Sequence, residues 1–300
     1  MYFCKELHIN MRKYFLSALF ILNLFVCFGQ NAKTSSVMIN KVTQPCVVMD
    51  YYFDVEIIEG ALYQKMTNAK LGKGEKTKDG FRLYKGITIT EIAPEKMDYY
   101  FNVEDRKQSA TVYMLCSKGY DNFLRSDDDS IVIQNIFKYL TSFATDANVF
   151  ALNQDIEKQN DLIKDGEKKS KNAVEDAERL QKDRAKIESK IANNILDTEN
   201  LKKEIEMEQK NYDNVKIKTA TVDGMKALKK EVKKAESNAK KAEKRYSDGL
   251  KDAIDYKEDL AKTDRKIEEN KNLQATLKTQ LETDKAQLSK LTEALNGLRK

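Results

Sequence analysis

The ten residues VKIKTATVDG, numbered 215–224, interrupt about 150 residues that otherwise have the composition of a Lys- and Glu-rich helix. Five of the ten are β-branched, and residue 224 is a glycine. β-Branched side chains lose rotamer freedom in a helix, and glycine costs about 1 kcal/mol relative to alanine there. The stretch is therefore a hairpin turn, a bent joint in one long rod or an accidental cluster. Which of these is correct decides the fold of the second half of the chain.

The sequence on either side of this stretch has the periodicity of a coiled coil. Residues spaced alternately three and four apart form one seam from Leu152 to Val215 and another from Met225 to Leu298. The first seam would continue at residues 226 and 229, whereas the second uses 225 and 228, so the register breaks at the interruption. We therefore predict an antiparallel hairpin within a coiled coil spanning 149–300. Its arms are 149–214 and 225–300, and its joint, 215–224, contains the hinge residues Val215, Ile217, Thr219, Thr221, Val222 and Gly224.

Both seams are unusually polar for a coiled coil. Polar or charged residues at core positions include Arg184, Asn194, Glu208, Asn270, Gln274 and Asp284. A single polar core residue fixes the register of a coiled coil at a cost in stability. So many of them predict either a loosely held hairpin or a seam with a further partner. Self-association is consistent with the second alternative.

The charge of the second half argues against nucleic acid as a partner. Residues 151–300 contain 35 Lys or Arg and 31 Asp or Glu, and the two signs are interspersed. Nucleic-acid-binding arms concentrate positive charge, whereas interspersed charges are typical of a solvated helical surface. We expect protein partners bound through the coiled coil.

The N-terminus has the pattern of a secretory signal. A short basic stretch precedes an apolar run over residues 14–28, and translation could start at Met1 or at Met11. The run is shorter than the roughly 20 residues of a membrane-spanning helix. We predict a signal peptide at 1–30 with cleavage near Gln30, no transmembrane span in the mature chain, and a periplasmic or extracellular location. Cleavage would remove His8, the only histidine.

Between signal and coiled coil we predict an α+β fold. Residues 31–43 read as a polar leader, and 44–148 as a head domain with the element order β-α-β-β-β-α, a small antiparallel sheet with two helices. The strands are expected near 44–53, 81–91, 97–104 and 110–117, and the helices follow Asp54 and the run SDDDS at 126–130.

One segment of the head also resembles a known group of proteins. DYYFNVEDRKQSATVYMLCSKGYDNFL, residues 98–124, followed by a helix and a charged helical tail, is similar to uncharacterised secreted bacterial proteins. In that group a small α+β domain, similar to TATA-binding-protein-like folds, precedes a coiled coil. The resemblance implies this fold and secretion, and it brings no activity or catalytic residue.

The head offers few candidate site residues. Cys46 and Cys116 could form a disulfide in an oxidising compartment or remain buried and unpaired. The acidic run at 126–130 is more typical of a helix N-terminus than of a cation loop. No catalytic, cofactor-binding or metal-binding residue is predicted, and no cofactor.

These observations favour a non-enzymatic exported envelope protein in which the coiled coil is a spacer or an interaction scaffold. The main alternative is an oligomeric adaptor whose hairpins bundle or tether envelope components. A third interpretation, a carboxylate-based hydrolase, receives little support from a mature chain without histidine.

Overall fold

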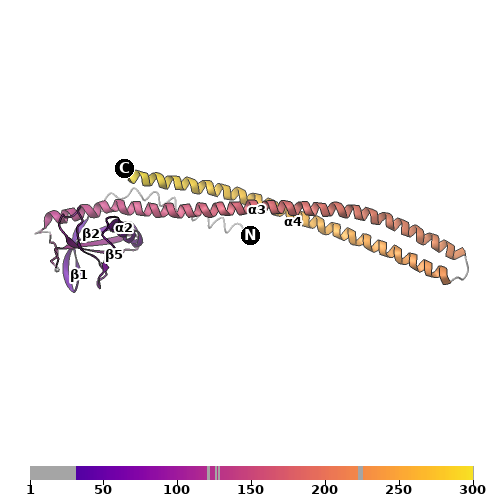
Figure 1. Ribbon diagram of the computed structural model, residues 1–300, viewed down its shortest axis with the longest axis horizontal. Helices are drawn as coiled ribbons and strands as arrows, with labels where there is room; N and C mark the ends of the chain where they lie inside the picture. Colours follow the sequence, from indigo (N-terminus) through magenta and orange to yellow (C-terminus); the bar gives the residue numbers. More distant parts are fainter. Residues whose placement is uncertain (1–31, 120–121, 126, 128, 222–225, 300) are drawn as a thin grey trace. The chain divides into compact units, whose positions relative to one another are not determined.

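The computed structural model describes residues 32–119, 122–125, 127, 129–221 and 226–299 (Figure 1). The chain forms two compact units. The first extends to Lys158 and includes Ser289–Lys300, and the second is Gln159–Leu288. The predicted signal peptide, 1–30, lies outside the described residues.

The first unit contains an antiparallel sheet of six strands. In chain order these are β1 (Lys33–Ile39), β2 (Val42–Tyr51), β3 (Glu75–Lys76), β4 (Arg82–Ile87), β5 (Met97–Asp105) and β6 (Ala110–Ser117). Their order across the sheet is β1-β2-β6-β5-β4-β3, and every neighbouring pair is antiparallel. The α+β class and the antiparallel sheet were predicted correctly.

The predicted polar leader at 31–43 was wrong, because most of it forms β1. Asn40 and Lys41 have φ values of 49° and 64°, the left-handed conformation of a two-residue hairpin turn, and they join β1 to β2. β1 lies at the edge of the sheet and its first residues are exposed. Because an exposed edge strand needs no apolar alternation, its sequence carried little strand signal.

Two helices cover one face of this sheet and form the main core with it. α2 (Val55–Asn68) buries Ile58, Leu62 and Met66, at the spacing that the sequence predicted. The N-terminal part of α3 (Ser130–Thr221) contributes three further buried apolar side chains, Ile136, Leu140 and Phe143. They pack against apolar side chains of β2, β5 and β6, namely Val47, Met49, Tyr51, Tyr99, Phe101, Val112, Met114 and Cys116. Each such side chain contributes about 1.5–3 kcal/mol when fully buried.

The opposite face of the sheet is also closed. Ile39, next to the β1–β2 turn, and Phe81, next to β4, belong to one buried cluster although β1 and β4 are separated by three strands. The backbone N–H of Asn40 donates to Oδ2 of Asp79 at 3.0 Å, so the β1–β2 and β3–β4 connections touch. The sheet therefore curls around this second core, which also contains Tyr100 and Leu115.

The second unit is an antiparallel helical hairpin formed by α3 and α4 (Lys226–Leu298). Nε2 of Gln159 donates to the carbonyl oxygen of Asp284. Nδ2 of Asn194 donates in the same way to the carbonyl oxygen of Gly249, so residue numbers rise along α3 as they fall along α4. The two helices lie side by side through this unit (Figure 1). The predicted hairpin is present.

The position of the joint differs from the prediction. α3 remains helical through Thr221, so Val215, Ile217, Thr219 and Thr221 belong to the first arm. Val222 and Gly224 lie outside the described residues. β-Branched residues cost only a few tenths of a kcal/mol each in a helix, which is too little by itself to end α3.

Candidate functional site

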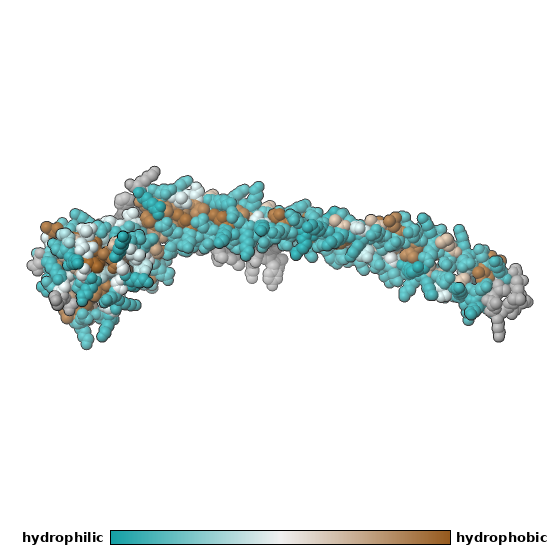
Figure 2. Space-filling view, viewed as in Figure 1, coloured by the Kyte–Doolittle hydropathy of each residue, from teal (hydrophilic) through white to brown (hydrophobic). Residues whose placement is uncertain are grey.

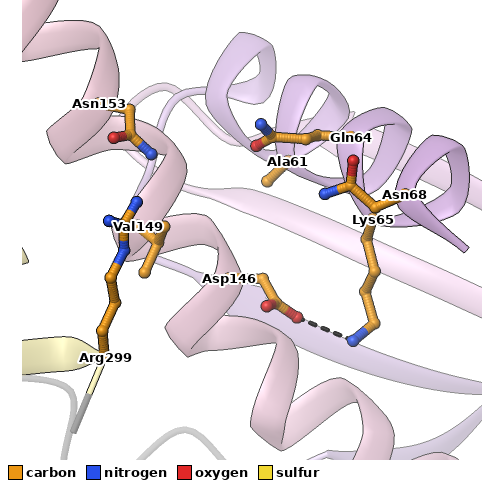
Figure 3. A pocket seen from close by; sticks show the side chains of 8 residues that line it. All are labelled: Ala61, Gln64, Lys65, Asn68, Asp146, Val149, Asn153 and Arg299. Carbon is orange, nitrogen blue, oxygen red and sulfur yellow. Dashed lines mark hydrogen bonds and ion pairs between the residues drawn. The ribbon is translucent and has the colours of Figure 1, made fainter.

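A small pocket in the first unit collects polar side chains from both of its covering helices (Figure 3). Its volume is about 200 Å³. Amide side chains of Gln64 and Asn68 on α2 and Asn153 on α3 line it, and Arg299 points toward it from the residue after α4. The remaining lining residues are Ala61, Lys65, Asp146 and Val149.

Lys65 is the most highly connected charged group of this pocket. Its Nζ lies 2.9 Å from Oδ2 of Asp146 on α3 and 3.4 Å from Oε1 of Glu91 in the connection before β5. The same ammonium lies 5.0 Å from the centre of the Tyr139 ring. Lys65 therefore links α2, α3 and the Glu91 segment. An ammonium with two carboxylate partners and an aromatic ring stabilises packing and does not resemble a free nucleophile.

The two tyrosines beside this ion pair do not supply a base either. Burial raises the pKa of Tyr139 far above its ordinary value, and the nearby carboxylates of Glu91 and Asp146 raise it further. Burial and Asp146 raise the pKa of Tyr51 in the same way, and its hydroxyl donates to the carbonyl oxygen of Leu140 at 2.7 Å. Both hydroxyls therefore stay protonated at neutral pH. This chemistry suits polar contacts better than acid–base catalysis.

A larger groove of about 380 Å³ runs between α2 and strands β3 to β5. Its lining includes the acids Glu56 and Glu59, the bases Lys76 and Arg82, and Tyr63. Because both signs of charge line the groove, it has no net preference for an anion or a cation.

The two cysteines of the sheet are free, so the disulfide considered from the sequence is not formed. Cys46 belongs to the core inside the curl, and Cys116 belongs to the core under the helices. Burial raises the pKa of the Cys46 thiol to about 11, and burial raises that of Cys116 still further. Two thiols on opposite faces of one sheet cannot pair without unfolding it.

The acidic run at 126–130 precedes α3, as expected for a helix N-terminus. α3 begins at Ser130, and the carboxylate of Asp129 forms an ion pair with Lys118. Two residues of the run, 126 and 128, lie outside the described residues.

Polar contacts join the two arms of the second unit along the seam. Nδ2 of Asn270 donates to the carbonyl oxygen of Ala173 at 3.0 Å, and Nε2 of Gln274 donates to Oδ1 of Asn270 at 2.7 Å. Arg184 reaches Oδ1 of Asp264 at 2.7 Å across the two helices. Asn270 and Arg184 therefore have partners on the opposite arm, and Nε2 of Gln274 also donates to the carbonyl oxygen of Ala173 there, at 3.3 Å.

Glycine seam positions let the two helices approach closely. A Cβ added at Gly166 would lie 2.9 Å from Cδ2 of Leu281, and one added at Gly249 would lie 2.9 Å from Cγ2 of Thr198. The hairpin combines close backbone approach with polar contacts and little apolar burial. Hydrophilic side chains cover most of the visible surface, with apolar patches among them (Figure 2).

One segment of α4 carries a cluster of lysines. Lys233, Lys240 and Lys244 lie on one stripe, together with Glu236, whose carboxylate forms an ion pair with Lys240. The stripe is exposed and shallow, as in a solvated helical face.

Sequence reasoning missed the Lys65 ion pair and the apolar side chains exposed on the hairpin. No local pattern brings Lys65, Glu91 and Asp146 together, because they come from three different elements. The exposed apolar residues were detectable, since Ile195 and Leu250 occupy positions next to the seam rather than in it.

None of the helices described is both long and apolar enough to cross a membrane. Within the same part of the chain, no group of three or more His, Cys, Asp or Glu side chains could hold a metal ion. No protein-family model matches the chain, and no curated protein is significantly similar to it.

Proposed function

We propose that this protein is a non-enzymatic exported envelope protein in which the α3–α4 hairpin serves as a spacer or an interaction scaffold. The observation that carries the proposal is the construction of the second unit. Residues 159–221 and 226–288 run antiparallel, 63 residues each, so each arm is about 95 Å long at a rise of 1.5 Å per residue.

The seam chemistry supports an interaction role. Small residues such as Ala173, Ala235 and Ala242 are buried in it, and Asn270 and Asp284 are polar residues buried beside them. Such a seam holds two helices in a defined register but buries little apolar area, so it contributes less stability than a leucine seam of the same length. A long hairpin of this kind offers much accessible surface per residue, which suits binding to other proteins.

The chemistry of the first unit supports a role without turnover. Glu91 and Asp146, the carboxylates nearest its pocket, both bind Lys65, and the remaining polar lining consists of amides and Arg299. Among the residues described around this pocket, no pair of carboxylates is placed to exchange protons with a substrate.

Export rests on residues 1–30 and on the resemblance of residues 98–124 to secreted bacterial proteins. Fractionation of cells producing the whole chain tests it. We expect a product that starts near Asn31 in the exported fraction, and an intact 1–30 segment retained in the cytoplasm would contradict export.

The scaffold role can be tested by shortening both arms together. Deleting 177–197 and 246–266 removes 21 residues, or three heptads, from each arm and keeps the remaining seam residues opposite one another. Each arm becomes about 31 Å shorter. Crosslinking in cells followed by mass spectrometry compares the partners of this variant with those of the full chain.

A length-matched control separates a spacer from a binding surface. It keeps 177–197 and 246–266 and their seam residues but exchanges the exposed residues for others of the same charge. A spacer loses function only on shortening, whereas a binding scaffold loses partners in both variants. An unchanged partner set and unchanged function in both variants would contradict the proposal. A hydrolytic activity of the purified chain that is lost on changing one Asp or Glu of the first unit would also contradict it.

The alternative function is an oligomeric adaptor whose hairpins bundle. Exposed aliphatic side chains on the hairpin favour it specifically, because the free energy falls when a partner removes aliphatic surface from water.

A further inference from the structure

Four large aliphatic side chains are exposed in the middle of the hairpin. Ile195 and Leu196 on α3 are 51% and 59% exposed, and Leu250 and Ile254 on α4 are 45% and 59% exposed. Their exposure contrasts with the charged residues that occupy most outward positions of this unit. We call these four residues the aliphatic patch.

The patch lies on one side of the hairpin. The Glu167–Lys285 ion pair marks that side, because its two charged atoms meet across the helices at 3.0 Å. Ile195 follows Glu167 by 28 residues, or four heptads, and Leu250 precedes Lys285 by 35 residues, or five heptads. Residues separated by whole heptads share a side, so Ile195 and Leu250 flank the seam on the same side.

The other two patch residues extend it outward. Leu196 is one residue after Ile195, and Ile254 is four residues, about one turn, after Leu250. Both therefore face outward from the same side of the hairpin.

Small side chains continue the surface along α3. Ala185, Ser189 and Ala192 are exposed, and they precede the larger residues at helical spacing. Ala192 lies seven residues after Ala185, and Leu196 lies seven residues after Ser189, so these residues share the outward face. Along this face of α3, three small residues are thus followed by the large side chain of Leu196.

We propose that a second copy of this chain docks on the α3 face formed by Ala185, Ser189, Ala192 and Leu196, with the two α3 helices antiparallel about a two-fold axis. Leu196 of each copy then fits against Ala185 of the other, and Ala192 fits against Ser189 of the other. A two-fold interface must be complementary to itself, and a large residue next to small residues on one helix meets this condition. The inference deepens the alternative of an oligomeric adaptor and rests on it.

Two pairs of charged residues next to these contacts fit the same pairing. On one side of the axis, Lys182 of the first copy faces Glu199 of the second. One turn further from the axis, Glu178 of the first copy faces Lys203 of the second. All four side chains are exposed and available. The same register therefore pairs Leu196 with a small residue and places two pairs of opposite charges beyond it. A parallel alignment of the two α3 helices would place like residues side by side.

Sedimentation equilibrium of a chain that starts at residue 32 tests the proposal. We expect a reversible dimer with a dissociation constant on the order of 1–100 µM, typical of a modest interface. Leu196→Glu should weaken the dimer at least about tenfold, because it replaces the large apolar contact with Ala185 by a charge. Met207→Glu is the matched control, since Met207 is 65% exposed on α3 but lies outside the patch, and it should leave the constant unchanged.

A charge exchange tests the antiparallel register. Lys182→Glu alone should weaken the dimer severalfold, since it sets two carboxylates against each other twice in a symmetric pair. Adding Glu199→Lys in the same chain should restore the original constant. Circular dichroism should show the same helix content in every variant.

Three results would overturn the proposal. The first is a monomer at all concentrations up to about 1 mM. The second is a dimer whose dissociation constant Leu196→Glu leaves unchanged. The third is a Lys182→Glu variant whose dissociation constant does not return to the original value when Glu199→Lys is added. None of these results depends on which envelope proteins bind the chain, so the scaffold proposal is tested separately by the shortened arms.

Discussion

Replacing Asn270 by aspartate should reveal how strongly the polar seam depends on one amide. Asn270 is 9% exposed, and its Nδ2 donates to the carbonyl oxygen of Ala173 at 3.0 Å. Its Oδ1 accepts from Nε2 of Gln274 at 2.7 Å. The substitution preserves size but sets a carboxylate oxygen against the Ala173 carbonyl oxygen. Loss of one hydrogen bond and desolvation of the charge should lower the free energy of unfolding by about 2–3 kcal/mol at pH 7.

The destabilisation should disappear in acid. A loss of this size corresponds to a folded-state pKa of the introduced carboxyl group about 2 units above its unfolded value near 4. The folded state then favours the protonated acid, which can donate to the Ala173 carbonyl oxygen as the amide did. The deficit relative to the natural chain is therefore full at pH 7, shrinks below about pH 6 and is lost near pH 4.

Urea unfolding followed by circular dichroism at 222 nm measures the effect, since α3 and α4 contain most of the helical residues. Hydrogen exchange of peptides covering 263–281 assigns it to the seam. Asn272→Asp is the matched control, because residue 272 is exposed on the same helix. If the two variants are equally stable at pH 7, or if the deficit of Asn270→Asp does not depend on pH, the polar contact does not hold the seam as described.

Two further predictions concern the first unit. Gly60→Ala should destabilise it by about 1–3 kcal/mol despite a gain in helix propensity of about 1 kcal/mol, because the added Cβ would lie 2.4 Å from Cζ of Phe150. Thermal unfolding measures this against Gly297→Ala, whose Cβ would meet nothing within 4 Å, and equal stability of the two variants would contradict the packing. Burial raises the pKa of Tyr99 from 10.0 to about 12, so its contribution to stability is complete below pH 10 and is lost as pH rises to 12. Tyr99→Phe should make alkaline unfolding less steep over this range, whereas Tyr52→Phe, at an exposed residue, should leave the slope unchanged.

The sequence was most informative where periodicity is long or burial is one-sided. The heptads of both arms and the spacing of Ile58, Leu62 and Met66 predicted correct helices, because each pattern repeats over several turns. The register break between the two seams located the reversal to within a few residues.

Other features depend on contacts that no local pattern encodes. β1 pairs only with β2, so its polar residues resembled a leader. The curl that brings Asn40 to Asp79 joins residues far apart in the sequence, as does the ion pair of Lys65 with Asp146. The predicted hinge residues from Val215 to Thr221 lie within α3, because the small helix penalty of β-branched residues does not by itself end a long helix.

The antiparallel hairpin within a single chain is the central claim, and one engineered disulfide tests it most directly. A Cβ at position 249 would lie 2.9 Å from Cγ2 of Thr198, so the two Cβ atoms are at most about 4.4 Å apart, within the range of a disulfide. In a chain starting at residue 32 with Cys46 and Cys116 replaced, Thr198→Cys with Gly249→Cys should oxidise rapidly within the monomer. Thr198→Cys with Ala235→Cys, displaced by 14 residues or about 21 Å along α4, should not. Crosslinks that form only between chains, or equally fast in the displaced pair, would contradict the hairpin.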